Sequence, residues 1–171
     1  LTAINAKYIH SNLAVYSLRA CAGEYKESVY LAEYTINNQK DYILEELYKK
    51  KPDVLCFSCY IWNLIYVEEI AREFKKICPD VPVWVGGPEV SYEVRTFMDA
   101  HPYIDGVMIG EGEDTFRQLC AYYDSIYDQA DNKNCSLSDI NGIAYKDKES
   151  KKIIFTEPRS IMDMSKIPFC Y

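Results

Sequence analysis

The seven cysteines are the residues of this sequence most able to do chemistry, because thiolates bind metals and act as nucleophiles. Only Cys56 and Cys59 are closely spaced, with two residues between them, as in half a zinc site or a redox pair. No second cysteine pair and no histidine pair at ligand spacing accompanies them. Because they lie in the apolar run 54–60, where alternation puts them on opposite sides of a strand, we expect both to behave as small buried hydrophobes.

Two histidines and one pair of carboxylates are the other candidates for catalysis. His101 precedes a proline in a polar stretch and is expected at the surface, whereas His10 lies in a loop where it could bind a metal or a ligand, or bond to backbone. Glu111 and Glu113 could act as an acid–base pair in a small α/β enzyme, but two side chains on one loop have no defined geometry. The residues therefore indicate binding more than catalysis, and we predict no catalytic residue and no protein metal site.

Composition narrows the possible partners. The 171 residues are 49% hydrophobic, 26% charged and 14% aromatic, with a formal net charge of −7. An acidic chain does not attract phosphate backbones or anionic lipid, so neither a nucleic acid nor a membrane surface is an expected partner. No apolar run approaches the length of a membrane span, and no signal peptide is visible. The scattered, odd set of cysteines favours a reducing compartment, so we predict a cytoplasmic protein.

Strand-like and helix-like segments alternate through most of the chain. Strands are expected at 1–5, 29–35, 54–60, 81–85 and 106–109, and helices at 12–24, 40–50, 64–77, 89–99 and 114–127. This alternation predicts an α/β fold with a doubly wound, five-stranded parallel sheet flanked by helices. After a polar linker, segments 143–145 and 153–156 flank a charged turn and predict a β-hairpin, followed by an extended exit. We therefore divide the chain into an α/β domain, 1–130, and a linker, hairpin and exit, 131–171.

The loops after the strands are where a ligand would bind. In an open parallel sheet, ligands lie beyond the carboxyl ends of the strands, near the point where strand order reverses. Gly86 and Gly87 allow a ligand or a neighbouring helix to come close, or simply form a tight turn. Neither glycine-containing loop matches a phosphate cradle or a dinucleotide fingerprint. Trp62 could cover a flat ligand or pack on the start of the next helix.

With its loops in this order, the chain resembles the N-terminal cobalamin-binding domain of cobalamin-dependent radical S-adenosylmethionine (SAM) enzymes. The resemblance covers essentially the whole chain, and five motifs in order carry it. They are Asn-Ala-Lys-Tyr-Ile-His-Ser-Asn-Leu at 5–13, Phe-Ser-Cys-Tyr-Ile-Trp-Asn at 57–63, Gly-Gly-Pro-Glu at 86–89, Gly-Glu-Gly-Glu at 110–113 followed by Thr115 and Phe116, and Ile-Asn-Gly-Ile-Ala-Tyr at 140–145 with Ile-Pro-Phe at 167–169.

The resemblance implies a flavodoxin-like, Rossmann-like sheet whose carboxyl edge holds the corrin ring, with the nucleotide tail beside the strands. It implies that Ser58 contacts the tail and that Gly86 and Gly87 leave space for it. The implied cofactor-binding residues are Asn5, Tyr8, His10, Ser58, Tyr60, Ile61, Trp62, Gly86, Gly87, Pro88, Glu89, Gly110 and Glu111.

The chain departs from related patterns at two places. Cobalamin domains of mutases and methionine synthase carry Asp-x-His-x-x-Gly, whose histidine ligates cobalt, and the loop 5–10 lacks this spacing. The resemblance therefore implies that the nucleotide base is displaced and that cobalt has no lower protein ligand, with His10 as an unusual ligand the alternative. Radical SAM enzymes hold a [4Fe-4S] cluster through Cys-x-x-x-Cys-x-x-Cys, a spacing absent from the seven cysteines.

These observations lead us to expect a cobalamin-binding module of a larger radical SAM enzyme, a methyltransferase or related. Its own C-terminal radical SAM domain would follow the exit segment and hold the cluster and SAM, so this chain alone is expected to be inert as an enzyme. The alternative is a scaffold of the same fold that has lost cobalamin and serves interdomain packing or substrate access. The substrate and the oligomeric state do not follow from the sequence.

Overall fold

A computed structural model describes residues 1–7, 11–127, 135–163, 165 and 167–170. Its strands are β1 (Thr2–Asn5), β2 (Ala32–Thr35), β3 (Leu55–Ser58), β4 (Val83–Gly86), β5 (Gly106–Met108), β6 (Ile143–Lys146) and β7 (Ile153–Phe155). Its α-helices are α1 (Leu13–Cys21), α2 (Lys40–Lys49), α3 (Leu64–Ile77), α4 (Val94–Ala100) and α5 (Glu113–Tyr127). Short 3₁₀ helices are η1 (Gly23–Ser28), η2 (Pro88–Val90) and η3 (Leu137–Asp139). Each expected strand and helix is present, although the first and fourth helices are each divided into an α-helix and a 3₁₀ turn.

The strands form one seven-stranded sheet in the order β2-β1-β3-β4-β5-β6-β7. The first five are parallel, which confirms the doubly wound fold, and their order 2-1-3-4-5 is that of flavodoxin-like sheets. The strand order reverses between β1 and β3. The hairpin does not stand apart, because β6 pairs antiparallel with β5, with Val107 opposite Ala144. The sheet therefore continues from the α/β part into the hairpin.

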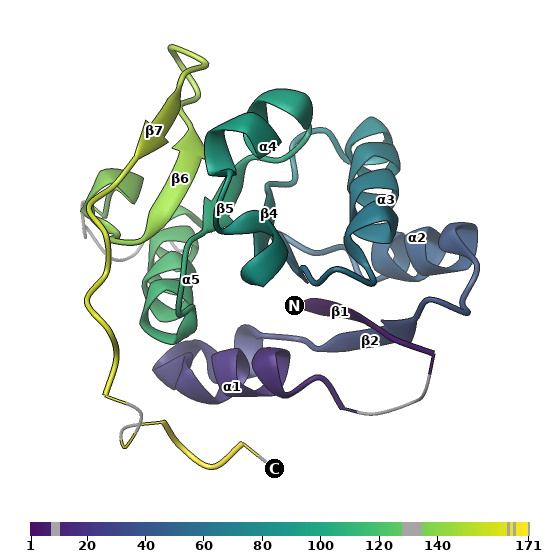
Figure 1. Cartoon of the computed structure of the whole chain (residues 1–171), viewed down its shortest axis with the longest axis horizontal. Helices are drawn as coiled ribbons and strands as arrows, with labels where there is room; N and C mark the ends of the chain where they lie inside the picture. The colour runs from purple at the N-terminus through teal and green to yellow at the C-terminus, as the bar shows by residue number, and fades with distance from the viewer. Residues whose placement is uncertain (8–10, 128–134, 164, 166, 171) are drawn as a thin grey trace.

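Helices cover both faces of the sheet, as Figure 1 shows. One hydrophobic core lies between the sheet and α2, α3 and α4, and it includes Phe57, Ile70 and Phe74. The other core lies under α1, η1 and α5, and it includes Trp84 and Phe116. The apolar stripe of α3 is buried at spacings of three and four residues, as expected for an amphipathic helix against a sheet. The helices packed on both faces thus fix where the loops after the strands leave the sheet.

The two closely spaced cysteines are confirmed as core residues on opposite faces of the sheet. Cys59 packs in the core under α2, α3 and α4, and Cys56 in the core under α5. Burial raises the pKa of Cys56 to about 11 and raises the pKa of Cys59 as well. All seven thiols are free. Among the described residues, no group of three or more histidine, cysteine, aspartate or glutamate side chains is arranged to hold a metal ion.

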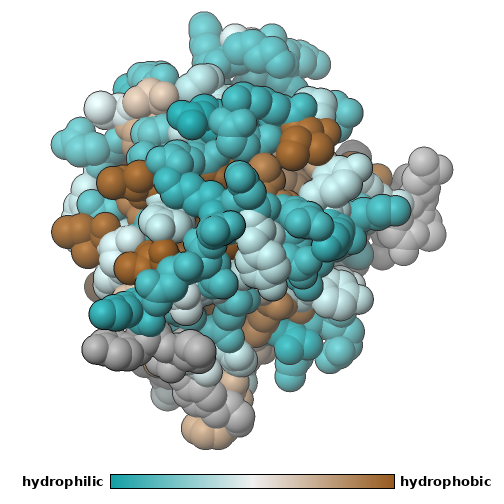
Figure 2. Space-filling model, turned by 90° about the vertical axis from the view of Figure 1, so that its right-hand side faces the viewer, coloured by the Kyte–Doolittle hydropathy of each residue, from teal (hydrophilic) through white to brown (hydrophobic). Residues whose placement is uncertain are grey.

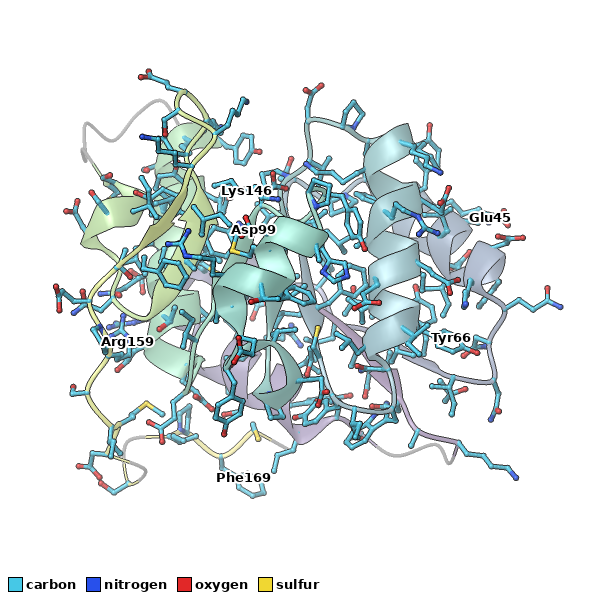
Figure 3. All side chains as sticks on the ribbon, turned by 45° about the horizontal axis from the view of Figure 1, so that its top comes forward. Glu45, Tyr66, Asp99, Lys146, Arg159 and Phe169 are labelled. Atoms are coloured by element: carbon cyan, nitrogen blue, oxygen red, sulfur yellow. The ribbon has the colours of Figure 1, made fainter. Side chains whose placement is uncertain are left out.

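The segment after β7, residues 156–163, is here called the strap. It is held at one end by a bond from Gly142 N, just before β6, to Glu157 O (2.8 Å), and at the other by a bond from Met162 N to Glu111 Oε2, after β5 (2.7 Å). Between them, Arg159 Nε donates to Thr115 Oγ1 of α5 at 2.8 Å. Figure 1 shows the strap running alongside α5, and Figure 3 shows Arg159 within the strap and Phe169 beyond it, toward the C-terminus. The exit is therefore extended, as expected, but held against the domain.

The face of the molecule that carries α2 and α3 is largely polar (Figure 2). Figure 2, which looks onto the side carrying α2 and α3, shows a mostly hydrophilic face with separate hydrophobic spots. Within the described part of the chain, no helix is both long and apolar enough to cross a membrane.

Candidate functional site at the carboxyl edge

Three expected loops begin from one row of residues at the carboxyl edge of the sheet. Ser58 of β3 is opposite Gly86 of β4, and Gly86 is opposite Met108 of β5. The loops that follow these residues therefore leave the sheet side by side. Asn5, which ends β1, lies one strand away and is buried, with an exposed fraction of 3%. The structure thus brings Asn5, Ser58 and Gly86 to the same edge.

Asn63 positions the loop after β3. It was not among the residues expected to bind the cofactor. Its side chain is fully buried, and Nδ2 donates to the carbonyls of Ile4 and Ser58, both at 2.9 Å. Its Oδ1 accepts from Tyr60 N at 2.8 Å. Asn63 therefore fastens β1, β3 and their loop together at the point where strand order reverses. The signals in the sequence were its place at the end of the motif 57–63 and its position just before a helix, which also fits an ordinary helix cap.

Tyr60 and Trp62 form a stacked aromatic pair in the loop after β3. Their ring centroids are 4.6 Å apart and their planes differ by 4°. Trp62 keeps 41% of its surface exposed, and Ile61 between them is 78% exposed. Trp62 thus packs on Tyr60 and leaves an apolar platform beside the carboxyl edge, which suits a flat ligand.

Gly87 and Gly110 of the candidate site differ in what an added side chain would meet. Gly87 has φ of 119°, and a Cβ there would lie 2.4 Å from the carbonyl oxygen of Cys59. Gly87 is therefore required by the close approach of two backbone segments, a role that needs no ligand. Gly110 has φ of 78° and nothing within 4 Å of an added Cβ, so its side faces open space. Pro88 and Glu89, in η2, are exposed.

The two glutamates after β5 do not form an acid–base pair. Glu111 accepts from the strap at Met162 N, whereas Glu113 Oε1 accepts from Ser17 Oγ of α1 at 2.9 Å. Each carboxylate is thus held by a different segment. His101, which was expected at the surface, is only partly exposed, with 18% of its side chain accessible. Its Nε2 is 3.1 Å from Glu68 Oε1, which links α4 to α3.

The loop after β1 is anchored by a polar cluster around Glu33 of β2. Glu33 Oε1 accepts from Asn12 N at 2.8 Å and from Asn5 Nδ2 at 3.3 Å. Glu33 Oε2 accepts from Tyr16 OH of α1 at 2.7 Å. Asn12 Nδ2 in turn donates to Asn5 Oδ1 at 3.2 Å. Tyr8 and His10, two of the expected cofactor-binding residues, lie outside the described residues.

Among the described residues, a hollow lies at each edge of the sheet. A cavity of about 550 Å³ opens at the amino edge, beside the start of β3 at Val54 and the end of α5 at Tyr127. It is remote from the carboxyl-edge loops. A shallower hollow of about 340 Å³ lies between Tyr92, Ile109 and Phe155, next to the loop that carries Gly110. The carboxyl edge is therefore an open rim rather than a closed catalytic slot.

A family profile for the B12 binding domain matches residues 1–120. The chain belongs to the B12-binding domain family. The cobalamin-dependent radical SAM methyltransferase TokK of Streptomyces tokunonensis is 38% identical over 102 residues, which cover 60% of this chain and 14% of TokK. The 2-(S-pantetheinyl)-carbapenam-3-carboxylate methyltransferase of Streptantibioticus cattleyicolor is 44% identical over 68 residues, which cover 40% of this chain and 10% of that enzyme. This B12-binding domain thus matches only a small part of each relative.

A solved structure confirms the fold of this B12-binding domain. The cobalamin-dependent SAM radical enzyme OxsB, with aqua-cobalamin and SAM bound, aligns with 94% of this chain and 22% of its own, with a TM-score of 0.67 and 16% sequence identity. The sequence-based identification of a cobalamin-binding domain of the radical SAM type is therefore confirmed, and cobalamin is the cofactor of the family.

The carboxyl edge of this B12-binding domain fits such a cofactor. A corrin is a broad, flat, largely apolar ring with amide side chains around its rim. The stacked pair Tyr60 and Trp62 supplies an exposed apolar surface after β3, and Gly110 faces open space in the loop after β5. Asn12 supplies a buried amide oxygen, Oδ1, for which the described residues provide no hydrogen-bond donor. The edge thus offers both apolar area and a polar group in need of a partner.

Proposed function

We propose that this domain binds cobalamin at the carboxyl edge of its sheet and presents it to a radical SAM domain of the same protein. The observation that carries the proposal is the meeting of the loops after β3, β4 and β5 at one open edge, beside the reversal of strand order. The family profile supports the cofactor, and the relatives that are cobalamin-dependent radical SAM enzymes support the larger setting.

Individual residues are assigned roles toward the corrin and its tail. Tyr60, Ile61 and Trp62 border the ring, since they form an exposed apolar platform. Glu89 and Gly110 border it from the loops after β4 and β5, and Ser58 lies at the end of β3, where a tail would enter beside the strands. Glu111, which the strap engages, borders the ring through its backbone.

Gly86, Gly87 and Pro88 complete the assigned edge, together with Asn5, Tyr8 and His10 of the first loop. Gly86 is the more suitable neighbour for a tail, because an added Cβ would lie 3.3 Å from the nearest atom of Met108, whereas at Gly87 it would lie 2.4 Å from a backbone oxygen. Gly87 contributes through its backbone, since its open side is already filled by Cys59. The lower face of cobalt carries no histidine of this chain in our proposal, and the nucleotide base is displaced from it.

When bound, cobalamin supplies chemistry at cobalt, such as carrying a methyl group, and the protein supplies its position and surroundings. In the complete protein, the [4Fe-4S] cluster and SAM would belong to the radical SAM domain. We place the module in a cytoplasmic enzyme, a methyltransferase or related, whose active site forms only when both domains are present. The strap, fixed by Arg159 and Glu111, gives the chain leading to that domain a defined path along α5.

Retention of hydroxocobalamin tests the proposal directly. The purified chain is mixed with hydroxocobalamin and desalted, and the visible spectrum is recorded alongside calorimetry. We expect corrin absorbance to stay with the protein, and Trp62→Ala to weaken binding about 5-fold or more through lost ring contact. Ile77→Ala is the matched control, because Ile77 is a comparably exposed apolar residue, 49%, at the far end of α3.

Two outcomes would contradict parts of this proposal. If no corrin absorbance and no heat accompany the wild-type chain at tens of micromolar cobalamin, the domain is a scaffold that has lost its cofactor. If the retained cofactor, reduced to cob(II)alamin, shows nitrogen hyperfine splitting, a nitrogen ligand holds the lower face. Loss of the splitting in His10→Ala would identify His10 as that ligand, and its persistence would identify the nucleotide base.

A further inference from the structure

Asn12 departs from the usual behaviour of an asparagine at the start of a helix. It is the N-cap residue of α1, a position where asparagine normally accepts a hydrogen bond from a backbone N–H of the first turn. Its side chain makes no such bond. Instead it is turned toward Asn5 at the end of β1, and the residue is only 6% exposed.

The orientation of this side chain is fixed by a chain of hydrogen bonds that starts at Glu33. The backbone N–H of Asn12 can only donate, so Glu33 Oε1 is an acceptor, and Asn5 must face it with Nδ2. Asn5 therefore presents its Oδ1 to Asn12, which must in turn face Asn5 with Nδ2. Exchanging the amide nitrogen and oxygen of either asparagine would set two acceptors against each other.

This arrangement leaves Asn12 Oδ1 as a buried acceptor without a donor among the described residues. A buried carbonyl oxygen left without a hydrogen bond costs about 1–3 kcal/mol. Such groups are rare in folded proteins, and a missing water, ion or ligand is a usual explanation. The position of Asn12 is informative because it bonds to Asn5 at the end of β1. The strand β1 borders the reversal of strand order, where an α/β sheet binds its ligand.

We propose that Asn12 is a cofactor-recognition residue whose Oδ1 accepts a hydrogen bond from an amide N–H of the bound cofactor. This inference rests on the proposed function. Cobalamin carries primary amides around the corrin and one secondary amide in the link to its nucleotide tail. It therefore presents several N–H donors that a buried acceptor could bind. The contact requires the side chain of Asn12 to become accessible to the cofactor, since Oδ1 is shielded from solvent in the structure.

The test measures hydroxocobalamin affinity of the whole chain by spectral titration. Asn12→Ala should weaken binding about 5- to 50-fold, the range expected for one hydrogen bond to an otherwise unsatisfied group. Asn12→Ser keeps a residue that favours helix caps and should show a similar loss while remaining folded. Asn37→Ala is the matched control, because Asn37 is an exposed asparagine whose side-chain Nδ2 donates to the backbone carbonyl of Lys7, and it should bind within 2-fold of wild type.

Cobyric acid, which lacks both the secondary amide and the nucleotide, distinguishes the two sources of the donor. Equal losses with cobyric acid and hydroxocobalamin assign the donor to a primary amide of the corrin rim, and a loss with hydroxocobalamin alone assigns it to the secondary amide of the link. If both Asn12 variants bind hydroxocobalamin within 2-fold of a wild type that itself binds, the inference is wrong and the proposed function stands. If wild type binds no hydroxocobalamin, the inference and the proposed function both fail.

Discussion

Asn63 shows how one side chain can hold a binding edge in shape. It satisfies two carbonyl oxygens and one backbone N–H, which belong to β1, β3 and the loop between β3 and α3. Asn63 is 59 residues away in the sequence from one of its partners, Ile4. The platform of Tyr60 and Trp62 begins at the backbone N–H that Asn63 holds, so the geometry of the platform depends on this residue.

Replacing Asn63 should therefore be costly. Asn63→Ala removes three hydrogen bonds in a fully buried place and should lower the free energy of unfolding by about 2–4 kcal/mol. Urea denaturation followed by circular dichroism measures the change. The exposed Asn37 provides the comparison, and Asn37→Ala should cost about 0.5 kcal/mol or less. A change of similar size in both variants would show that Asn63 does not organise the edge.

At the scale of elements, the turn from β4 into η2 depends on Gly87. The strand β3 lies beside β4, and Cys59 N donates to Gly86 O at 2.7 Å just beyond the end of both strands. Gly87 follows with a positive φ, which brings its α-carbon against the backbone of Cys59. The turn thus couples the two loops that carry most of the assigned corrin contacts.

Replacing Gly87 and Gly110 with alanine separates the cost of steric collision from the cost of backbone strain. Gly87→Ala places a Cβ 2.4 Å from the Cys59 carbonyl and should lower the free energy of unfolding by about 3 kcal/mol or more, because strain and collision add. Gly110→Ala has positive φ but open space, so about 1 kcal/mol is expected. Thermal unfolding measures both. Equal costs would mean that the turn relaxes easily and that Gly87 is kept for another reason.

For the whole molecule, buried thiols and phenols make the fold sensitive to alkali. Burial raises the pKa of Cys56 to about 11, that of Cys120 to about 12 and that of Tyr34 to about 12, and it also raises the pKa of Tyr123. Each group keeps its proton in the folded state at a pH where the unfolded chain releases it. The stability tied to these groups is therefore complete below pH 9 and decreases as the pH rises toward the folded pKa values.

This linkage predicts a fall in stability between pH 9 and pH 11. The contribution of Cys56 alone should be about 1–3 kcal/mol over that range. Urea midpoints measured at intervals from pH 8 to 11 follow it. Cys56→Ala should flatten the profile, whereas Cys135→Ala should not, because Cys135 is exposed. Parallel profiles for wild type and Cys56→Ala would contradict a raised pKa at this thiol.

The sequence determined the elements, their alternation and hence the edge at which the loops meet, because hydrophobic period and strand–helix alternation are local signals that leave few topologies. The positions of Ser58 and Gly86 in one row follow from that topology. Cysteine spacing and the apolar run around it likewise sufficed to predict buried thiols.

Only the tertiary structure showed that the hairpin extends the same sheet, that Arg159 and Glu111 hold the strap, and that Cys59 fills the space beside Gly87. The same is true of Asn63, which bonds to Ile4, and of the orphaned oxygen of Asn12. Each of these features is a contact between residues distant in the chain. Such contacts depend on side-chain direction and hydrogen-bond satisfaction, which no local pattern encodes.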